Sequence, residues 1–272
     1  MTDVDAQPAT GPTVSAPAAP LLRVEGISLS FGGVNALTDV SFDVLPGELF
    51  SIIGPNGAGK TSMFNCLNGV YNPQQGRIML GDFDVTSAKP LAIAKQGMAR
   101  TFQNLGLFMN LNVIDNLMLG RHLKMKSGFL AGAIWYGKAR REEIEHRRRV
   151  EEIIELLELQ QYRYNPVGLL PYGIQKRLEL GRALAMDPVV LLLDEPVAGM
   201  NHEETEDMAR YILEIKAELD LAIILVEHDM AMVMDISDRV MALNFGTPIA
   251  LGTPDEVRSS PAVIEAYLGD AS

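Results

Sequence analysis

The chain has 272 residues and a mass of 29.7 kDa, which suits one large α/β domain or one domain with an inserted subdomain. Its formal net charge is -12, and this acidic balance argues against DNA or RNA as the main partner, because nucleic-acid binding needs a basic field. A single cysteine, Cys66, excludes a disulfide framework and a zinc cluster.

The first twenty residues are expected to lie outside the folded domain. They are rich in alanine and proline, and Asp3 and Asp5 stand where a signal peptide would carry basic residues. A membrane-spanning helix needs about 20 mainly apolar residues, and the best candidate, residues 128–137, is too short. We therefore expect residues 1–20 to be a disordered tail, followed by a domain that does not span a membrane.

After Pro20 the pattern favours strands. We expect short strands at residues 21–24, 28–31, 40–44, 49–53 and 77–80. The run LFSII at 49–53 is typical of a buried strand, because it is wholly apolar apart from one serine and has glycine on both sides. A helix should begin in the glycine-rich loop near Gly59 and end near Gly69.

From about residue 90 to residue 171 strand patterns become sparse. Helices are expected at residues 91–96, 113–126 and 138–159. In the last of these, Ile144, Val150 and Ile154 mark one apolar face, with arginine and glutamate elsewhere. This block reads as a helical subdomain set into the α/β domain.

The α/β pattern then resumes. We expect helices at 178–186 and 203–219, and strands at 189–193, 221–226, 239–244 and 248–251. The runs VVLLL and LAIILV are continuously apolar and lie between helices, which is typical of a parallel sheet covered on both faces.

A phosphate-binding loop follows the strand at 49–53 and opens the next helix. The match to G-x4-G-K-[ST] consists of Gly54, Pro55, Asn56, Gly57, Ala58, Gly59, Lys60 and Thr61. Glycines let the backbone wrap a phosphate, and the helix N-terminus favours the anion. Lys60 would contact the β- and γ-phosphates and Thr61 would bind Mg²⁺. The alternative, a glycine-rich turn without a ligand, is disfavoured by the strand–loop–helix context.

Two adjacent acids supply the second half of the predicted site. Asp194 and Glu195 follow the buried strand at 189–193, so Asp194 would lie near a metal and Glu195 near an attacking water. Paired acids after a strand can also cap a helix, but the upstream phosphate loop favours the catalytic interpretation. The chain has no Asn-Lys dipeptide, the motif with which GTPases read guanine.

The order of the motifs resembles the ATP-binding cassette (ABC) family over residues 21–269. After the phosphate loop come Gln103 in RTFQN, a signature-like segment before a helix, LLLDEP, and His228 in VEHDM. The resemblance implies an α/β fold: a P-loop ABC ATPase domain with an antiparallel β subdomain and an inserted α-helical subdomain. It implies ATP and Mg²⁺ as cofactors.

The resemblance also implies a role for each matching residue. Phe31 matches the aromatic residue that stacks on adenine, and Ser62 extends the phosphate-binding set. Gln103 matches the glutamine that touches Mg²⁺ and water and reports to the membrane subunit. Asp194 matches the metal-site aspartate, with Glu195 as the general base. His228 matches the histidine on the γ-phosphate; the alternative, a core histidine at a strand end, is disfavoured by its place between LAIILV and Asp229.

Two segments depart from the usual cassette pattern. The signature segment, residues 170–174, reads LPYGI where Leu-Ser-Gly-Gly-Gln is usual. In the family this segment holds the γ-phosphate of the opposite subunit. Pro171 has neither hydroxyl nor N–H for that contact, whereas Gly173 and the helix start after it can still serve an anion. We expect Tyr172 to act through backbone and packing. Asn201 stands where an aspartate is usual.

These departures resemble the ATP-binding subunits of branched-chain amino acid importers. The segments that carry the likeness are RTFQ, YGIQKRLE, EPVAGMN, GTP at 252–254 and AYLG at 266–269. The resemblance implies a second, identical or different, cassette, two transmembrane permease subunits and an external solute-binding protein, on the cytoplasmic face of the inner membrane, without nucleic acid. The extra segment at 121–149 points to the larger of two cassettes.

Two other classes remain as alternatives. A non-transport ABC ATPase acting on nucleic acid or ribosomes would predict two cassettes in one chain and a basic face, and a regulatory cassette would lack Glu195 or His228. The segment 127–149 has two interpretations as well. It is either a hairpin packed on the helical subdomain, followed by a charged helix, or an aromatic segment around Trp135 that meets membrane subunits or lipid.

Overall fold

The computed structural model describes residues 19–101, 106–124 and 138–268. Three sequence-based predictions therefore lie wholly or mostly outside the described residues: the tail at 1–20, of which only residues 19 and 20 are described, Gln103, and the aromatic part of the 127–149 segment with Trp135. Within the described ranges, no helix is long and apolar enough to cross a membrane.

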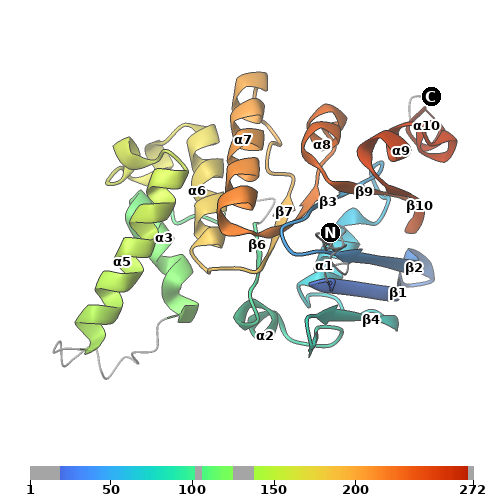
Figure 1. The fold of residues 1–272 in the computed structure, drawn as a ribbon, viewed down its shortest axis with the longest axis horizontal. Coiled ribbons are helices and arrows are strands. Elements are labelled where there is room, and N and C mark those ends of the chain that lie inside the picture. The colour runs from blue at the N-terminus through green and yellow to red at the C-terminus, as the bar shows by residue number, and fades with distance from the viewer. Residues whose placement is uncertain (1–18, 102–105, 125–137, 269–272) are drawn as a thin grey trace, which may run out of the picture.

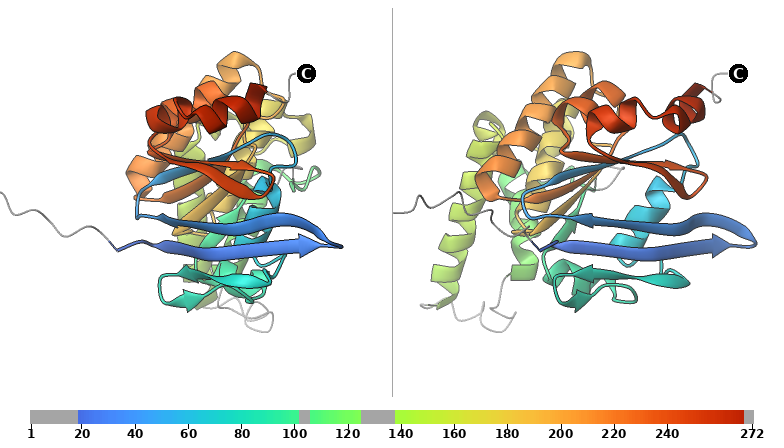
Figure 2. Two further views of the ribbon diagram at one scale, coloured as in Figure 1. Left: turned by 90° about the vertical axis from the view of Figure 1, so that its right-hand side faces the viewer. Right: turned by 45° about the vertical axis from the view of Figure 1, so that its right-hand side comes forward.

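In the described part of the chain, ten strands form two sheets, which Figure 2 shows as separate layers. The four-stranded sheet is antiparallel and has the order β2-β1-β4-β5. The six-stranded sheet has the order β10-β9-β3-β8-β7-β6 and is parallel except for β10. The strands are β1 (Leu22–Phe31), β2 (Val34–Val44), β3 (Leu49–Ile53), β4 (Gln75–Leu80), β5 (Phe83–Asp84), β6 (Met98–Arg100), β7 (Val190–Asp194), β8 (Ala222–Val226), β9 (Arg239–Asn244) and β10 (Thr247–Gly252).

The central strands of the six-stranded sheet are buried on both faces. Every residue of β3, β7 and β8 is buried. Because successive side chains of a strand point to opposite faces, Leu49 and Ile53 join one apolar cluster while Phe50 and Ile52 join another. The expected parallel sheet with two covered faces is confirmed.

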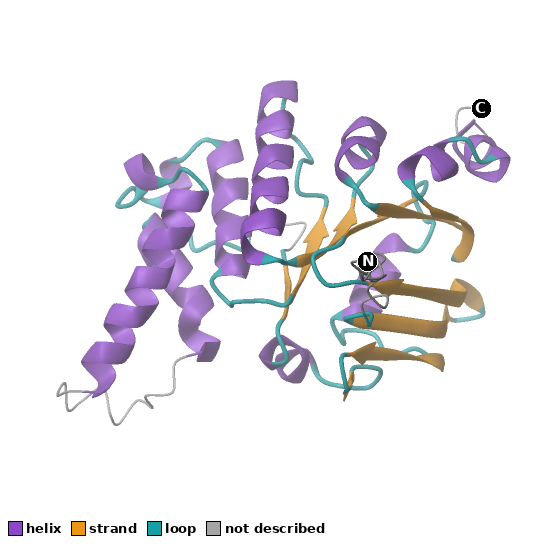
Figure 3. Cartoon of the chain, in the orientation of Figure 1, coloured by secondary structure: helices purple, strands orange, loops and turns teal. Residues whose placement is uncertain are grey.

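Helices lie on both sides of this sheet, and Figure 1 gives their arrangement. The helix α1 packs Met63, Phe64 and Leu67 into the cluster shared with the four-stranded sheet. Figure 3 places α3, α5 and α6 together at the end of the molecule away from that sheet. The helices are α1 (Lys60–Leu67), α2 (Pro90–Lys95), α3 (Val113–Gly120), α5 (Lys138–Leu156), α6 (Tyr172–Leu184), α7 (His202–Leu219), α8 (Met230–Ile236), α9 (Pro254–Arg258) and α10 (Pro261–Leu268), with 3-10 turns at Arg121–Lys124, Gln160–Tyr162 and Val167–Leu169.

The structure adds elements that were not expected, namely β5, β6, α8, α9 and α10, and it joins two expected strands into one. β1 is one strand rather than two, because a register shift near Gly26, which has φ of 60°, lets pairing continue through the interruption. β6 lies in the block where helices were expected and pairs in parallel with β7. The short helix α8 was not expected, because its seven residues are too few to show a clear period.

Hydrogen bonds and ion pairs connect α5 and the turn after α3 to the loop that precedes β7. Arg121 donates to His146 Nδ1 at 3.1 Å and pairs with Asp187. Arg149 of α5 donates to the other oxygen of Asp187 at 2.9 Å. Partial burial alone would raise the pKa of the Asp187 carboxyl, but the hydrogen bonds and charges of Arg121 and Arg149 outweigh it and lower that pKa.

Replacing the Asp187 carboxylate should therefore cost stability in a pH-dependent way. We expect Asp187→Asn to lower the free energy of unfolding at pH 7 by about 1–2 kcal/mol, less than for a fully buried pair because the carboxylate is partly exposed. A lowered folded-state pKa means that this contribution is present above the ordinary value of 3.8 and fades as the pH falls through the folded pKa. Urea denaturation of both proteins across this range measures it, and a deficit that did not shrink at low pH would contradict the ionic explanation.

Candidate functional site

The loop between β3 and α1 requires glycine at particular positions. Gly54, Gly57 and Gly59 have φ of 151°, 81° and 104°, a region that other residues rarely adopt. A Cβ at Gly54 would overlap the Leu243 carbonyl oxygen of β9, and one at Gly59 would lie 2.6 Å from the Ala36 carbonyl oxygen. The loop is thus wedged against β9 and β2 by backbone contacts that only glycine permits.

Lys60 points into this loop. Its side chain is buried, and its Nζ donates to the carbonyl oxygens of Gly54 at 2.6 Å and Pro55 at 3.0 Å. Burial lowers the pKa of the Lys60 ammonium, while the negative charges of Glu195 and Asp194 oppose that shift. The predicted phosphate-binding lysine and the two predicted acids therefore share one electrostatic environment.

Asp194 is buried at the end of β7 and is held by an arginine that sequence reasoning missed. Arg100, the last residue of β6, donates to Asp194 Oδ2 at 2.6 Å and to Asn65 Oδ1 of α1 at 2.8 Å. The Asp194 N–H donates to Thr101 Oγ1 at 3.3 Å. The Arg100 guanidinium therefore links the edge strand β6 to Asp194 and to helix α1. The one feature of the sequence that could have pointed to Arg100 is its position three residues before Gln103, in the same motif.

Glu195 has an unusual backbone conformation. Its φ is 49°, in the left-handed region, which costs a residue other than glycine roughly 1–3 kcal/mol. Its N–H donates to the Val226 carbonyl oxygen at 2.9 Å, so the turn is tied to the end of β8. Strained backbone of this kind persists where the surrounding structure fixes it, and it sets the direction in which the carboxylate leaves the chain.

His228 and Glu227 follow β8 with opposite burial. The His228 side chain is 64% exposed, so it is not a core histidine, and its Nδ1 lies 3.4 Å from Glu227 Oε2. Glu227 is fully buried, and Val197 of the neighbouring loop donates its backbone N–H to Glu227 Oε1 at 3.0 Å. Sequence reasoning missed Glu227, since a glutamate after an apolar strand carries no signal of burial by itself.

Phe31 is the last residue of β1 and is 48% exposed. The ring meets Tyr71 edge to face, with centroids 5.1 Å apart and an interplanar angle of 67°. The Tyr71 N–H donates to the Asn65 carbonyl oxygen of α1 at 2.9 Å, which ties the aromatic pair to the helix behind the phosphate loop. The geometry suits stacking of a planar base on an exposed aromatic face.

The signature segment packs against the loop that follows Glu195 in the same chain. Pro171 is the N-cap of α6, and the hydroxyl of Tyr172 donates to the Ala198 carbonyl oxygen at 3.1 Å. A Cβ at Gly173 would lie 2.5 Å from Glu204 Oε1, so a larger residue at this position would require the Glu204 side chain of α7 to move. Tyr172 thus makes a side-chain contact that the sequence analysis did not foresee.

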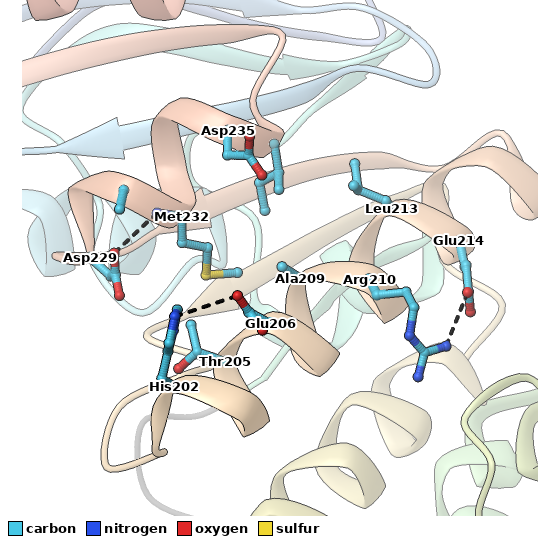
Figure 4. A pocket seen from close by; sticks show the side chains of 12 residues that line it. His202, Thr205, Glu206, Ala209, Arg210, Leu213, Glu214, Asp229, Met232 and Asp235 are labelled. Carbon is cyan, nitrogen blue, oxygen red and sulfur yellow. Dashed lines mark hydrogen bonds and ion pairs between the residues drawn. The ribbon is translucent and has the colours of Figure 1, made fainter.

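Asn201 keeps a structural role in place of the usual aspartate. It caps α7, and its side chain and that of Glu204 form a reciprocal capping box. A cavity of about 630 Å³ lies between α7 and α8, lined among others by His202, Asp229 and Met232 (Figure 4). This cavity does not include the phosphate loop.

The predicted metal ligands offer oxygen donors. Thr61 lies in the first turn of α1, next to Ser62, and Asp194 supplies a carboxylate that Arg100 holds in place. Hydroxyl and carboxylate oxygens are what Mg²⁺ takes alongside phosphate oxygens, so the donor set fits this ion. Gln103, the third predicted ligand, lies outside the described residues.

Comparisons with known proteins show the family of the chain. A family model described as "ABC transporter" matches residues 37–198, which is more than half of the chain. The chain belongs to the ABC transporter family. A second model, described as "Branched-chain amino acid ATP-binding cassette transporter", matches residues 247–272.

The chain matches two named relatives over nearly the whole length of each relative. The chain is 42% identical over 252 residues to the high-affinity branched-chain amino acid transport ATP-binding protein LivG of Escherichia coli K12, covering 93% of this chain and 99% of LivG. It is 40% identical over 252 residues to BraF of Pseudomonas aeruginosa, with the same coverage of both chains.

Solved structures confirm the fold. A crystal structure of an ATP-binding cassette of an ABC transporter in its ADP conformation matches with a TM-score of 0.80 and 30% identity, covering 93% of this chain and 100% of the other. A nucleotide-free cassette matches with a TM-score of 0.78 and 29% identity, over 92% and 99% of the two chains. These structures show the P-loop ABC ATPase fold, and the family model and the ATP-binding relatives indicate nucleotide binding and ATP hydrolysis.

Removal of the buried ammonium should weaken nucleotide binding. We expect Lys60→Ala to lower affinity for ATP by about 10- to 100-fold, the loss of one or two charge-assisted hydrogen bonds. Titration with a fluorescent ATP analogue measures this. Lys95→Ala, which removes an exposed lysine at the end of α2, is the matched control. Unchanged affinity of the Lys60 variant would contradict its assignment to the phosphates.

Loss of the tyrosine hydroxyl should have a small effect. Tyr172→Phe removes one partly exposed hydrogen bond to a backbone carbonyl, worth about 1 kcal/mol, so we expect ATP turnover to fall by a few-fold at most. Tyr164→Phe, at an exposed tyrosine, is the control in the same steady-state assay. A loss of a hundredfold or more would mean that the hydroxyl takes part in catalysis.

Proposed function

We propose that this chain couples ATP binding and hydrolysis to the import of branched-chain amino acids or a related small solute. One observation carries the assignment of its site. The strand order β3-β8-β7 brings the phosphate loop, His228 and the Asp194–Glu195 pair to the same edge of one sheet. The likeness to LivG and BraF over nearly their whole length supports the class of solute.

In the proposed mechanism, the loop from Gly54 to Ser62 binds the phosphates of ATP through backbone N–H groups, with Lys60 on the β- and γ-phosphates. Thr61, Gln103 and Asp194 would hold Mg²⁺, which would supply positive charge next to the phosphate oxygens. Glu195 accepts a proton from the attacking water, which bonds to the γ-phosphorus as the bond to the β-γ bridging oxygen breaks. His228 donates a hydrogen bond to the γ-phosphate, and Phe31 stacks on adenine.

The complete transporter would need further chains. We infer that a second cassette, identical or different, closes on two ATP molecules, and that Pro171, Tyr172 and Gly173 of one cassette complete the site of the other. The proposed membrane partners are two permease subunits, with an external solute-binding protein, and the cassette lies on the cytoplasmic face of the membrane. Closure of the two cassettes would move the permeases, and hydrolysis would reopen them.

Glu195→Gln tests the catalytic part of this proposal. The amide keeps the shape of the side chain but cannot accept the proton, so turnover should fall by about 10²- to 10⁴-fold while ATP affinity stays within about twofold. The assay uses the tagged full-length chain with whatever co-purifies. Glu203→Gln, an exposed acid in the first turn of α7, is the control. Turnover close to that of the parent would remove Glu195 from the role of base.

The same preparation tests the transport part. Membrane proteins that co-purify with the tagged chain, together with loss of leucine, isoleucine or valine uptake in cells carrying only the Glu195→Gln variant, would support the importer assignment. Co-purification with nucleic acid or ribosomes, with uptake unchanged, would overturn it in favour of a non-transport ABC ATPase.

A further inference from the structure

We propose that Glu227 is a positioning residue that holds His228 and the loop after Glu195 in one geometry for ATP hydrolysis. This inference rests on the proposed function of the site. Glu227 lies at the end of β8, between a buried strand and the exposed histidine. It touches neither the phosphate loop nor its lysine in any contact that the structure gives, so its influence on the reaction would act through its two neighbours.

Each carboxylate oxygen of Glu227 serves a different loop. Oε1 accepts the N–H of Val197, 30 residues earlier in the chain, at 3.0 Å. Oε2 accepts the N–H of His228 at 2.9 Å and that of Asp229 at 3.4 Å, and lies 3.4 Å from His228 Nδ1. A single fully buried side chain therefore joins the backbone two residues after Glu195 to the backbone of His228.

The chemistry of the site requires a carboxylate. An ionised glutamate is an acceptor on both oxygens, and the groups around it donate. Glutamine has the same shape but would turn an NH₂ group toward one of these N–H donors, so one of the two loops would lose its partner. Charge-assisted hydrogen bonds are about twice as strong as neutral ones, which is what a clamp between two loops needs.

Two further contacts restrict the same pair of loops. The Glu195 N–H donates at 2.9 Å to the carbonyl oxygen of Val226, which is the residue just before Glu227. On the other side, Asp229 caps α8 by accepting the N–H of Met232 at 3.1 Å, which fixes the chain after His228 (Figure 4). Glu227 thus completes a set of hydrogen bonds that links the backbone around the candidate base to the backbone of His228.

A purely structural role is the competing explanation, since any buried acid must satisfy its oxygens. The chain supplies a matched control at Glu48, which is also buried. It accepts the Leu45 N–H at 2.6 Å and lies 3.2 Å from Arg239 Nη1. Glu48 precedes β3 and so lies at the opposite end of that strand from the phosphate loop. Glu48→Gln therefore reports the cost of neutralising a buried glutamate away from the site.

The experiment compares Glu227→Gln, Glu48→Gln, His228→Ala and the double variant Glu227→Gln/His228→Ala in the tagged full-length chain with its co-purifying partners. We expect Glu227→Gln to lower kcat by about 10- to 100-fold with ATP affinity within about twofold. Glu48→Gln should lower the melting temperature without this fall in kcat. Because part of the effect of Glu227 acts through His228, the loss of kcat in the double variant should be smaller than the product of the two single losses.

Each other outcome overturns the proposal. Equal kcat for Glu227→Gln and the parent would remove the positioning role, and fully multiplicative losses in the double variant would show that Glu227 does not act through His228, which the proposal requires. If Glu227→Gln does not fold, Glu227→Asp keeps the charge on a shorter side chain, and the same cycle with His228→Ala decides. If His228→Ala and Glu195→Gln both hydrolyse ATP like the parent, the proposed site itself fails, which is a separate result.

Discussion

Parallel pairing of β3, β8 and β7 is the constraint on which the rest of the site depends. Parallel strands point their carboxyl ends to the same edge of a sheet, where ligands bind in open α/β folds. The phosphate loop, Glu227–His228 and Asp194–Glu195 each follow one of these strands directly. Groups more than a hundred residues apart in the chain are thereby brought together without any long loop. The burial of both sheet faces keeps these strands in register.

The site contains several buried charged side chains, and the attraction between opposite charges offsets the desolvation cost of burying them. Lys60 is buried beside two acids, whose charges offset the desolvation that lowers its pKa. The Asp194 carboxylate is likewise offset by the positive charge of Arg100, whose Nη2 lies 2.6 Å from Asp194 Oδ2. A nucleotide brings further negative charge, so cations already in place near the loop favour its binding. The net charge of -12 for the whole chain therefore says little about the local field at the phosphates.

The sequence alone sufficed for the strands that carry the site, because LFSII, VVLLL and LAIILV are apolar runs of strand length next to recognisable motifs. It could not reveal β6, since three residues show no period, and so it missed Arg100 as the partner of Asp194. Glu227 was missed for another reason. Its role is defined by hydrogen bonds to backbone groups, and the Val197 N–H that it binds is 30 residues away with no sequence mark.

Tyr172, one of the departures in the signature segment, is linked by a series of hydrogen bonds to His228. The Tyr172 hydroxyl at the start of α6 holds the Ala198 carbonyl oxygen, Val197 next to it donates to Glu227, and Glu227 holds the backbone of His228. These contacts form a continuous path from the signature segment to the candidate γ-phosphate histidine within one chain. A coupling between the two ends is a hypothesis that contact alone does not establish. The path passes through Val197 and Ala198, and the Ala198 N–H donates to the carbonyl oxygen of the strained Glu195 at 3.3 Å, so a shift of α6 that moves Ala198 would act on backbone that is bonded to the candidate base.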